Sequence, residues 1–509
     1  MKNFTGFNSN KKYWRQKTYS LSIIFLLLLN IFSGLIASDA DLDPANYPKG
    51  AIPLSEQQIS DIKANWPRIL AVRPNKYGAA RIQEAMKEQG ITLRAIEAVA
   101  DDQDEFITNK NSDSNTALMS AAALPSQVDN SKLACFPPIG NQKSQGSCVG
   151  WASTYYHATH EYGLLNGKNN KTNSAGIRSP KWTYNMLNWG NDAGAYPTDA
   201  YVLLKSNGAP GYNDFLYDTN YREWDLKTQD WISALSYRMS EPLFITINVP
   251  SDIDTVKQIL NNGHIVTFTT FANSWQFSKV SADPSQSNPY VGQRIITWVN
   301  GAVGGHHATI VGYDDNVWVD LNGNGKVDPG EKGAFLMANS WGTGWANAGF
   351  AWISYDAFFK TSRVANGPSG ANRRPITSTI FSITPKSPNY TPKAIAKFAL
   401  TQTVRKDLNI TLGASNTNAT SPSTKLVSGA LTADGGAYAF DGLSPHLQTA
   451  TFVLDATDLL PATNTPQKYY LIVEDTTTGN KTTLNSYSMV DLVNNKEVSL
   501  KEVPVSFDT

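Results

Sequence analysis

The stretch 141–151 contains the residue best placed to act as a nucleophile. Cys148 follows the pair Gly146-Ser147 and precedes a run with helical character, 149–165. A cysteine at a helix N-terminus faces unpaired backbone N–H groups and the positive end of the helix dipole, which favour the thiolate over the thiol. Gly146 would let a peptide backbone approach closely. The alternative interpretation is that Cys148 is a small buried apolar residue at the start of a helix.

A nucleophilic cysteine needs a base to take its proton and a third group to orient that base. The chain has six histidines. Four of them lie on the predicted helix or in contexts that suggest no catalytic role: His157, His160, His264 and His446. The remaining pair, His306 and His307, enters a predicted strand directly after two glycines. The candidate base is therefore in this pair.

Three sequence blocks resemble the signature blocks of papain-like cysteine peptidases and follow the order of that family. They are Gln142 with Cys148, then 307–313 (HATIVGY), then 339–345 (NSWGTGW). The resemblance extends over about residues 124–360. It implies an α+β papain-like fold, with a helical lobe and a β-barrel-like lobe, and an activity that hydrolyses peptide bonds.

The resemblance also implies a role for each matching residue. Cys148 would be the nucleophile, and His307, which precedes Ala as the family histidine does, would be its acid and base, with His306 as the competing choice. Cys148 and His307 are expected to form a resting thiolate–imidazolium ion pair. Asn339 would orient the imidazole, and Gln142 would stabilise the oxyanion together with the Cys148 backbone N–H. The expected substrate-contacting residues are Gly146, Gly194, Ala195, Trp341 and Trp345. Trp341 would also shield the hydrogen bond between the histidine and Asn339 from water.

Two positions near the nucleophile differ from the family pattern. Gln145 stands where the family has a cysteine, and Val149 stands where it has an aromatic residue. The disulfide that usually staples this loop is therefore absent, which fits a bacterial branch better than plant or lysosomal enzymes. The second cysteine, Cys135, is expected to be a buried free thiol. A Cys135–Cys148 disulfide is the alternative, and it would block the nucleophile.

An insertion between His307 and Asn339 matches the twelve-residue calcium-loop pattern. The two residues are 32 positions apart, about twice the usual family interval, and the excess includes 320–331 (DLNGNGKVDPGE). Oxygen ligands stand at alternating positions with Gly at the sixth, and the last Glu would bind bidentately. The flanking residues are strand-like, which predicts a structural calcium site at a hairpin tip. The alternative is a turn without metal. The expected ligands are Asp320, Asn322, Asn324, Asp328, Glu331 and the backbone carbonyl of Lys326.

The chain of 509 residues is too long for one core, so several domains are expected. Basic residues precede an apolar run at 21–37, which is the layout of a secretory signal; an uncleaved anchor is the alternative. We predict a secreted or cell-surface protein, or a periplasmic one. The predicted segments are a signal peptide (1–40), a helical pro-segment and linker (41–123), a papain-like catalytic domain (124–365), a linker (366–377) and an all-β sandwich (378–509).

Charge and composition limit the partners. The chain has 43 basic and 43 acidic residues, so no net field favours nucleic acid or an anionic membrane surface. The expected partners are a protein or peptide substrate, and a surface, polysaccharide or protein ligand of the sandwich. No organic cofactor and no membrane contact after signal cleavage are expected. Two other functions stay open: a non-catalytic surface or adhesion protein, and an acyl transferase of the transglutaminase kind.

Overall fold

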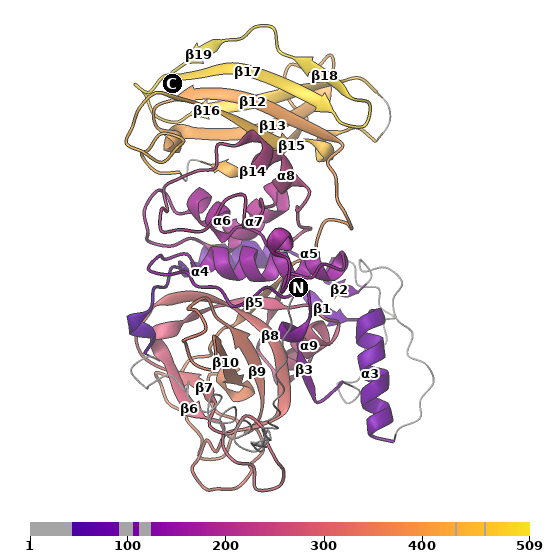
Figure 1. Ribbon diagram of the computed structural model, residues 1–509, viewed down its shortest axis with the longest axis vertical. Helices are drawn as coiled ribbons and strands as arrows, with labels where there is room; N and C mark the ends of the chain where they lie inside the picture. The colour runs from indigo at the N-terminus through magenta and orange to yellow at the C-terminus, as the bar shows by residue number, and fades with distance from the viewer. Residues whose placement is uncertain (1–42, 91–104, 111–123, 433–434, 463–464, 509) are drawn as a thin grey trace, which may run out of the picture.

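The computed structural model describes residues 43–90, 105–110, 124–432, 435–462 and 465–508. The predicted signal peptide and parts of the predicted pro-segment and linker, 91–104 and 111–123, lie outside these ranges. No helix within them is long and apolar enough to cross a membrane. Figure 1 shows three layers along the long axis: a β-sandwich, a layer of helices, and a strongly curved sheet with the N-terminal helices beside it.

The N-terminal segment packs along the other domains. It consists of η2 (Pro44–Asn46), α2 (Glu56–Asn65), β1 (Ile69–Val72), α3 (Lys76–Glu88) and β2 (Phe106–Thr108), with β1 and β2 antiparallel. Helix α2 begins with a capping box, in which Ser55 Oγ accepts from Gln58 N at 3.2 Å and Gln58 Oε1 accepts from Ser55 N at 2.9 Å. Asn75 caps helix α3, because its side chain accepts from Gly78 N.

The helical layer is built around one buried helical run that starts at Cys148. Its parts are α4 (Cys148–Gly150), the π-helix η6 (Trp151–Ala158) and α5 (Thr159–Leu165). All eight residues of η6 are buried, so this run is surrounded by the other helices and the sheet on all sides. The neighbouring helices are α6 (Pro180–Leu187), α7 (Pro197–Asn207) and α8 (Thr228–Leu235).

A nine-stranded sheet forms the second lobe and carries both histidines. Its order is β4-β11-β5-β8-β9-β10-β7-β6, with β3 paired to β8. The long central strand β8 is antiparallel to β5 and β9. Helix α9 (Pro250–Asn261) packs against it. The strands are β3 (Gln127–Asp129), β4 (Leu243–Thr246), β5 (Val266–Phe271), β6 (Trp275–Lys279), β7 (Arg294–Val299), β8 (Gly305–Trp318), β9 (Lys332–Ala338), β10 (Phe350–Ser354) and β11 (Thr379–Ser382).

The predicted linker 366–377 and the predicted sandwich start at 378 differ from the structure. Strand β11 pairs with β4 and β5 of the nine-stranded sheet, so it belongs to that lobe. The preceding residues are packed as well: Arg373 Nη2 lies 2.9 Å from Asp356 Oδ2 in a buried ion pair, and Ile376 N donates to Ala357 O at 2.9 Å. The sandwich begins only with β12.

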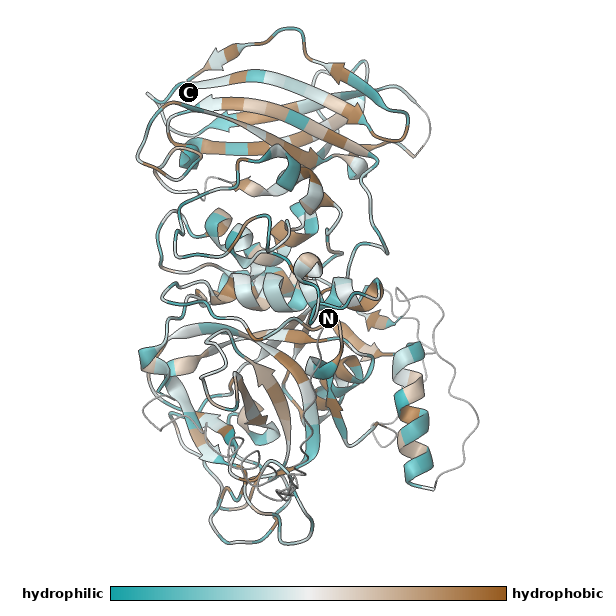
Figure 2. Ribbon diagram, in the orientation of Figure 1, coloured by the Kyte–Doolittle hydropathy of each residue, from teal (hydrophilic) through white to brown (hydrophobic). Residues whose placement is uncertain are grey.

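The sandwich consists of two antiparallel sheets, ordered β15-β12-β17-β18 with β19 on β17, and β14-β13-β16. Hydropathy alternates along these strands in Figure 2. The strands are β12 (Ala394–Gln402), β13 (Leu408–Asn416), β14 (Thr424–Thr432), β15 (Gln448–Asp455), β16 (Gln467–Asp475), β17 (Thr482–Asp491), β18 (Lys496–Ser499) and β19 (Val505–Phe507).

The sandwich is not a separate unit, in contrast to the sequence-based expectation. One hydrophobic cluster includes side chains of the helical layer, such as Leu203 and Trp231, and of the sandwich, such as Phe398 and Phe452. The rings of Trp231 and Phe452 meet edge-on at 5.2 Å. The sandwich and the helical layer therefore complete each other's core.

Candidate functional site

Cys148 is the first residue of the central helical run and lies at its contact with β8. Its side chain is fully buried (0% exposed), and its Sγ accepts from the backbone N–H of His307 at 3.4 Å. This contact places the peptide bond between His306 and His307 against the thiol. Burial raises the pKa of Cys148 to about 12, although nearby backbone N–H groups, first that of His307 and then that of Ala51, act in the opposite direction.

Asn339 binds His306 and not His307, so the predicted His307–Asn339 pair is wrong. The Nε2 atom of His306 lies 2.8 Å from Asn339 Oδ1. The backbone N–H of Ser340 donates to the same Oδ1 at 2.8 Å, which identifies it as the oxygen of the amide. Nε2 of neutral His306 therefore carries the proton, and Nδ1 is the basic nitrogen. Nδ1 is buried and has no hydrogen-bond partner among the described residues.

His307 points to the opposite face of β8, since successive side chains of a strand alternate. Its Nδ1 lies 3.1 Å from Thr269 Oγ1, and its ring lies 6.3 Å from that of Phe381. The register between β8 and β9 explains why Asn339 binds His306. Thr309 pairs with Ala338, so the next residue after Ala338, Asn339, lies opposite Ala308. Ala308 and His306 are two residues apart and share a face.

Two tryptophans cover the His306–Asn339 hydrogen bond. The ring of Trp341 lies 4.6 Å from that of His306, and Trp275, which the sequence did not indicate, lies 5.9 Å away. Trp345 was expected to line the cleft, but it is fully buried and packs edge-on against Trp341 at 5.2 Å. Trp345 therefore supports Trp341 from behind.

Gln142 is held rigidly beside the thiol loop. Its Oε1 accepts from Ser340 Oγ at 2.6 Å, and its Nε2 donates to Gln145 O at 2.8 Å. Nε2 also lies 3.3 Å from the carbonyl oxygen of Pro48. The amide N–H of Gln142 thus points toward a peptide carbonyl in the cleft, as a donor to a developing oxyanion must.

Residues 47–52 of the N-terminal segment cover this site. Ala195 N donates to Gly50 O at 2.8 Å, and Ile52 N donates to Ala195 O at 3.0 Å, which makes a short parallel β-bridge. Gly50 N and Ala51 N both donate to the carbonyl of Gly305, at 3.1 and 3.0 Å. A peptide backbone thus already occupies the predicted Gly194-Ala195 subsite.

The covering segment fits closely because glycines meet where it crosses the cleft. A Cβ atom on Gly50 would lie 1.7 Å from the Gly146 carbonyl oxygen, and one on Gly194 would lie 2.2 Å from Gly50 O. At the other end of the segment, Tyr47 stacks on Trp341 at 4.7 Å, and Trp341 Nε1 donates to Pro48 O at 3.0 Å. The segment therefore excludes water from the thiol.

The predicted thiolate–imidazolium pair is absent from this covered state. Burial lowers the pKa of His306 to about 4, partly offset by the hydrogen bond to Asn339. Burial also lowers the pKa of His307 to about 3. With the pKa of Cys148 at about 12, the thiol and both imidazoles are neutral at pH 7.

The second cysteine and the remaining core histidines are structural. Cys135 is a buried free thiol, as predicted, with its Sγ 3.6 Å from His160 Nδ1. His157 Nδ1 lies 3.0 Å from the Tyr201 hydroxyl. Both histidines are buried on the central helical run and reach no residue of the site.

The calcium-loop sequence forms the connection between β8 and β9, as a hairpin tip. Asp320 accepts from Asn324 N and Gly325 N at 3.0 and 2.8 Å. The side-chain amides of Asn322 and Asn324 both donate to Asp328 Oδ2 at 2.7 Å. Buried Glu331 accepts from Trp318 Nε1, Leu321 N and Asp328 N at 2.9 to 3.0 Å. Within the described ranges, no three His, Cys, Asp or Glu side chains are grouped for a metal ion.

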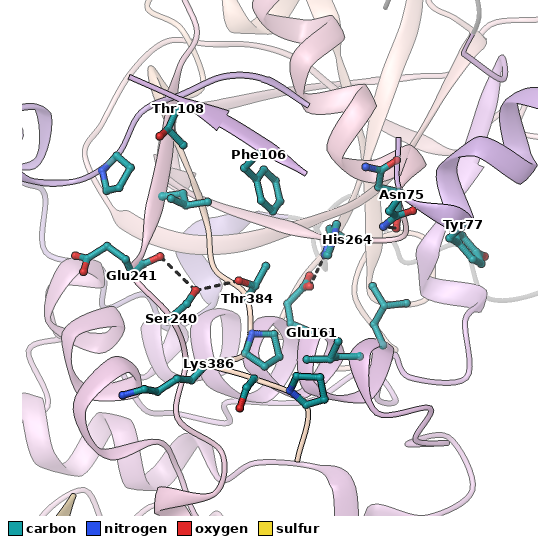
Figure 3. Close-up of a pocket in the computed structure, with 18 of the residues that line it drawn as sticks. Asn75, Tyr77, Phe106, Thr108, Glu161, Ser240, Glu241, His264, Thr384 and Lys386 are labelled. Atoms are coloured by element: carbon teal, nitrogen blue, oxygen red, sulfur yellow. Dashed lines mark hydrogen bonds and ion pairs between the residues drawn. The ribbon is translucent and has the colours of Figure 1, made fainter. Parts of the chain in front are cut away.

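A buried charge cluster that the sequence did not indicate joins the N-terminal segment to the helical layer and the nine-stranded sheet. His264 Nδ1 lies 2.5 Å from Glu161 Oε2 (Figure 3). Its Nε2 lies 3.1 Å from Glu105 Oε1. Although burial opposes the charge, these carboxylates raise the pKa of His264 well above its ordinary value. The cluster lies at a cavity of about 640 Å³ whose lining does not include Cys148.

Comparisons with known proteins give structural matches at low identity. Neither a family model nor a curated protein matches the chain. Xylellain, a cysteine protease from Xylella fastidiosa, is 19% identical over 52% of this chain and 88% of its own, with a TM-score of 0.33. The recombinant stem bromelain precursor is 14% identical over 72% and 89%, with a TM-score of 0.36. Procathepsin B S9 from Trypanosoma congolense is 15% identical over 52% and 78%, with a TM-score of 0.35.

Proposed function

We propose that this chain is the precursor of a papain-like cysteine peptidase that hydrolyses peptide bonds. The single observation that carries the proposal is the arrangement at β8. The basic nitrogen of His306 has no partner in the described part of the chain, its other nitrogen is fixed by Asn339, and the adjoining peptide contacts the Cys148 thiol. In this arrangement the base, held in place by the orienting group, can activate the thiol as a nucleophile.

The reaction starts once the cleft is open. His306 Nδ1 takes the proton of Cys148, and the thiolate attacks the carbonyl carbon of the peptide bond. Gln142 Nε2 and the Cys148 backbone N–H donate to the oxyanion. His306 then gives its proton to the leaving amine, and an acyl-enzyme remains. Water, deprotonated by His306, attacks the thioester and releases the acid and the free thiol. Asn339 keeps the imidazole in the required tautomer through both steps.

His306 replaces His307 as the proposed acid and base. His307 faces Thr269 and gives the site only its backbone N–H, which no substitution of the side chain removes.

The test compares matched variants of the two adjacent histidines in processed protein. His306→Ala is expected to lower kcat for casein or a peptide by at least about a hundredfold, the loss typical for a general acid and base. His307→Ala is expected to retain most of kcat, and Cys148→Ala to abolish hydrolysis. A His307→Ala protein as inactive as Cys148→Ala would restore the sequence-based choice. Incorporation of amines without hydrolysis would identify an acyl transferase, and an active-site thiol that no epoxide probe labels would favour a binding protein.

The segment 47–52 is proposed to inhibit the precursor until it is removed. It blocks the oxyanion donor Gln142 and the backbone of Ala195 at the same time. If segment 41–123 added as a separate peptide failed to inhibit the processed enzyme, the segment would be a structural extension instead.

Export of the protein, on the basis of the predicted signal peptide, is also proposed.

We further propose that the 320–331 hairpin binds calcium. The hairpin carries the complete ligand pattern, and Glu331 is already oriented by three N–H groups. A calcium ion there would need the amides of Asn322 and Asn324 to turn their oxygens inward. It would brace the turn between β8, which carries His306, and β9, which ends just before Asn339.

A further inference from the structure

The C-terminal sandwich touches the loop that pairs with the peptide in the cleft. We call residues 188–195 the pairing loop and residues 435–440 the support loop. A Cβ atom on Gly436 would lie 2.5 Å from Gly190 Cα and 2.6 Å from Trp189 O, and one on Gly190 would lie 2.8 Å from the ring of Tyr438. The two loops therefore meet backbone to backbone, with no room for a side chain on either glycine.

Arg405 of the sandwich holds the support loop against the helical layer. Arg405 is 1% exposed, and its guanidinium donates to the carbonyls of Gly435 and Phe440 at 2.6 and 3.1 Å. Its Nη2 also donates to the carbonyl oxygen of Arg222 at 2.5 Å, and the guanidinium lies over the Trp224 ring at 4.3 Å. Burial lowers the pKa of Arg405 to about 9, so this group is still charged at pH 7. One buried cation thus ties the support loop to Arg222 and Trp224 of the helical layer.

Hydrogen bonds continue this contact into the pairing loop. Asn188 Nδ2 donates to Tyr221 O, next to Arg222, and Asn188 Oδ1 accepts from Gly190 N, both at 2.8 Å. Further along the loop, Asp192 Oδ1 accepts from Gly146 N at 2.9 Å, two residues before the nucleophile. The loop ends at Ala195, whose N–H and C=O bind the covering segment.

We propose that the sandwich positions the pairing loop and so sets how tightly an extended peptide binds in the cleft. The inference rests on the proposed peptidase function, because the peptide takes the place of residues 50–52. Gly436, Tyr438 and Arg405 are positioning residues, since none of them touches the peptide. A shift of the pairing loop weakens main-chain hydrogen bonds that are made equally in the ground state and the transition state, and such a loss raises KM while kcat is kept.

The test is a pair of glycine substitutions in the processed full-length chain. Gly436→Ala adds a methyl group against Gly190, at φ +74°. Gly479→Ala is the control, because Gly479 also has positive φ (+98°) but its added methyl would contact nothing within 4 Å. Gly436→Ala is expected to raise KM for a peptide that reaches Ala195 by about fivefold, the factor for one net hydrogen bond. Its kcat and the rate of Cys148 alkylation by iodoacetamide should stay at the control values.

A second variant guards against a folding defect. Tyr438→Ala keeps the backbone and removes the ring that packs on Gly190, and it should raise KM in the same way. Equal KM values for both variants and the control would refute the positioning role. A parallel loss of kcat and of alkylation would refute it too, because the whole site would then have been disturbed. A processed wild-type protein that hydrolyses no peptide would remove the proposed function and this inference with it, whereas normal hydrolysis with equal KM values refutes the inference alone.

Discussion

Displacing the covering segment should restore the reactivity of the Cys148 thiol. With a pKa of about 12, the covered thiol is ionised to about one part in 10⁴ at pH 8, whereas an ordinary thiol of pKa ~8.5 is about one quarter ionised. The thiolate is the species that reacts, so uncovering should raise the alkylation rate by up to about two-thousandfold. Because the shift is upward, the rate for the covered thiol should rise about tenfold per pH unit until pH approaches 12.

Gly50→Ala is the perturbation that tests this. Its methyl group would lie 1.7 Å from Gly146 O, so the segment has to leave its place. Gly90→Ala is the matched control in the same N-terminal segment, because Gly90 also has positive φ (+71°) and its methyl would meet no atom of the described residues within 4 Å. Iodoacetamide alkylation of the unprocessed chain is followed by peptide mass spectrometry, with buried Cys135 as internal reference. Equal rates at Cys148 in the two variants, or a fast rate in the wild-type precursor, would refute the reasoning.

Three further outcomes are expected. The folded-state pKa values of His306 and His307 are depressed, to about 4 and about 3. The two imidazoles therefore contribute stability that is present above pH 6.5 and is lost as the pH falls toward these values. Urea unfolding at pH 7 and at pH 4 measures this loss, and an unchanged urea midpoint would contradict it. A chelator should lower Tm of the wild-type chain, and much less that of Asp320→Ala; an equal fall in both would exclude the calcium site. Glu105→Gln should lower Tm by weakening the ion pair with His264, and a Tm equal to wild type would show that this pair adds no net stability.

The sequence predicted the order of the lobes but not which histidine meets Asn339. Local patterns are sufficient for α2, whose capping box is present, and for the strands around His306. The choice between the two histidines depends on the register between β8 and β9, which is fixed by pairing across the 320–331 insertion. A one-residue change of register moves every side chain of a strand to the other face. The residues next to the two histidines in the sequence therefore cannot decide which histidine meets Asn339.

Long-range contacts account for the other differences. Residues 366–377 are rich in Gly, Pro and Asn, yet buried Arg373 pairs with Asp356 and holds them on the lobe. The covering of Cys148 by residues 47–52 also joins segments about a hundred positions apart. Nothing in the local sequence of either segment encodes such a contact.

The shared core of the helical layer and the sandwich bears on how the chain is made. Its members extend from Ala51, in the segment that covers the cleft, to Tyr487 on β17. A ribosome therefore synthesises Cys148 long before the strands that complete its surroundings. Contacts of such large sequence separation form late and slowly. The helix that carries Cys148 should thus acquire its final packing only when the last strands emerge, by which time the first-made segment is available to occupy the cleft.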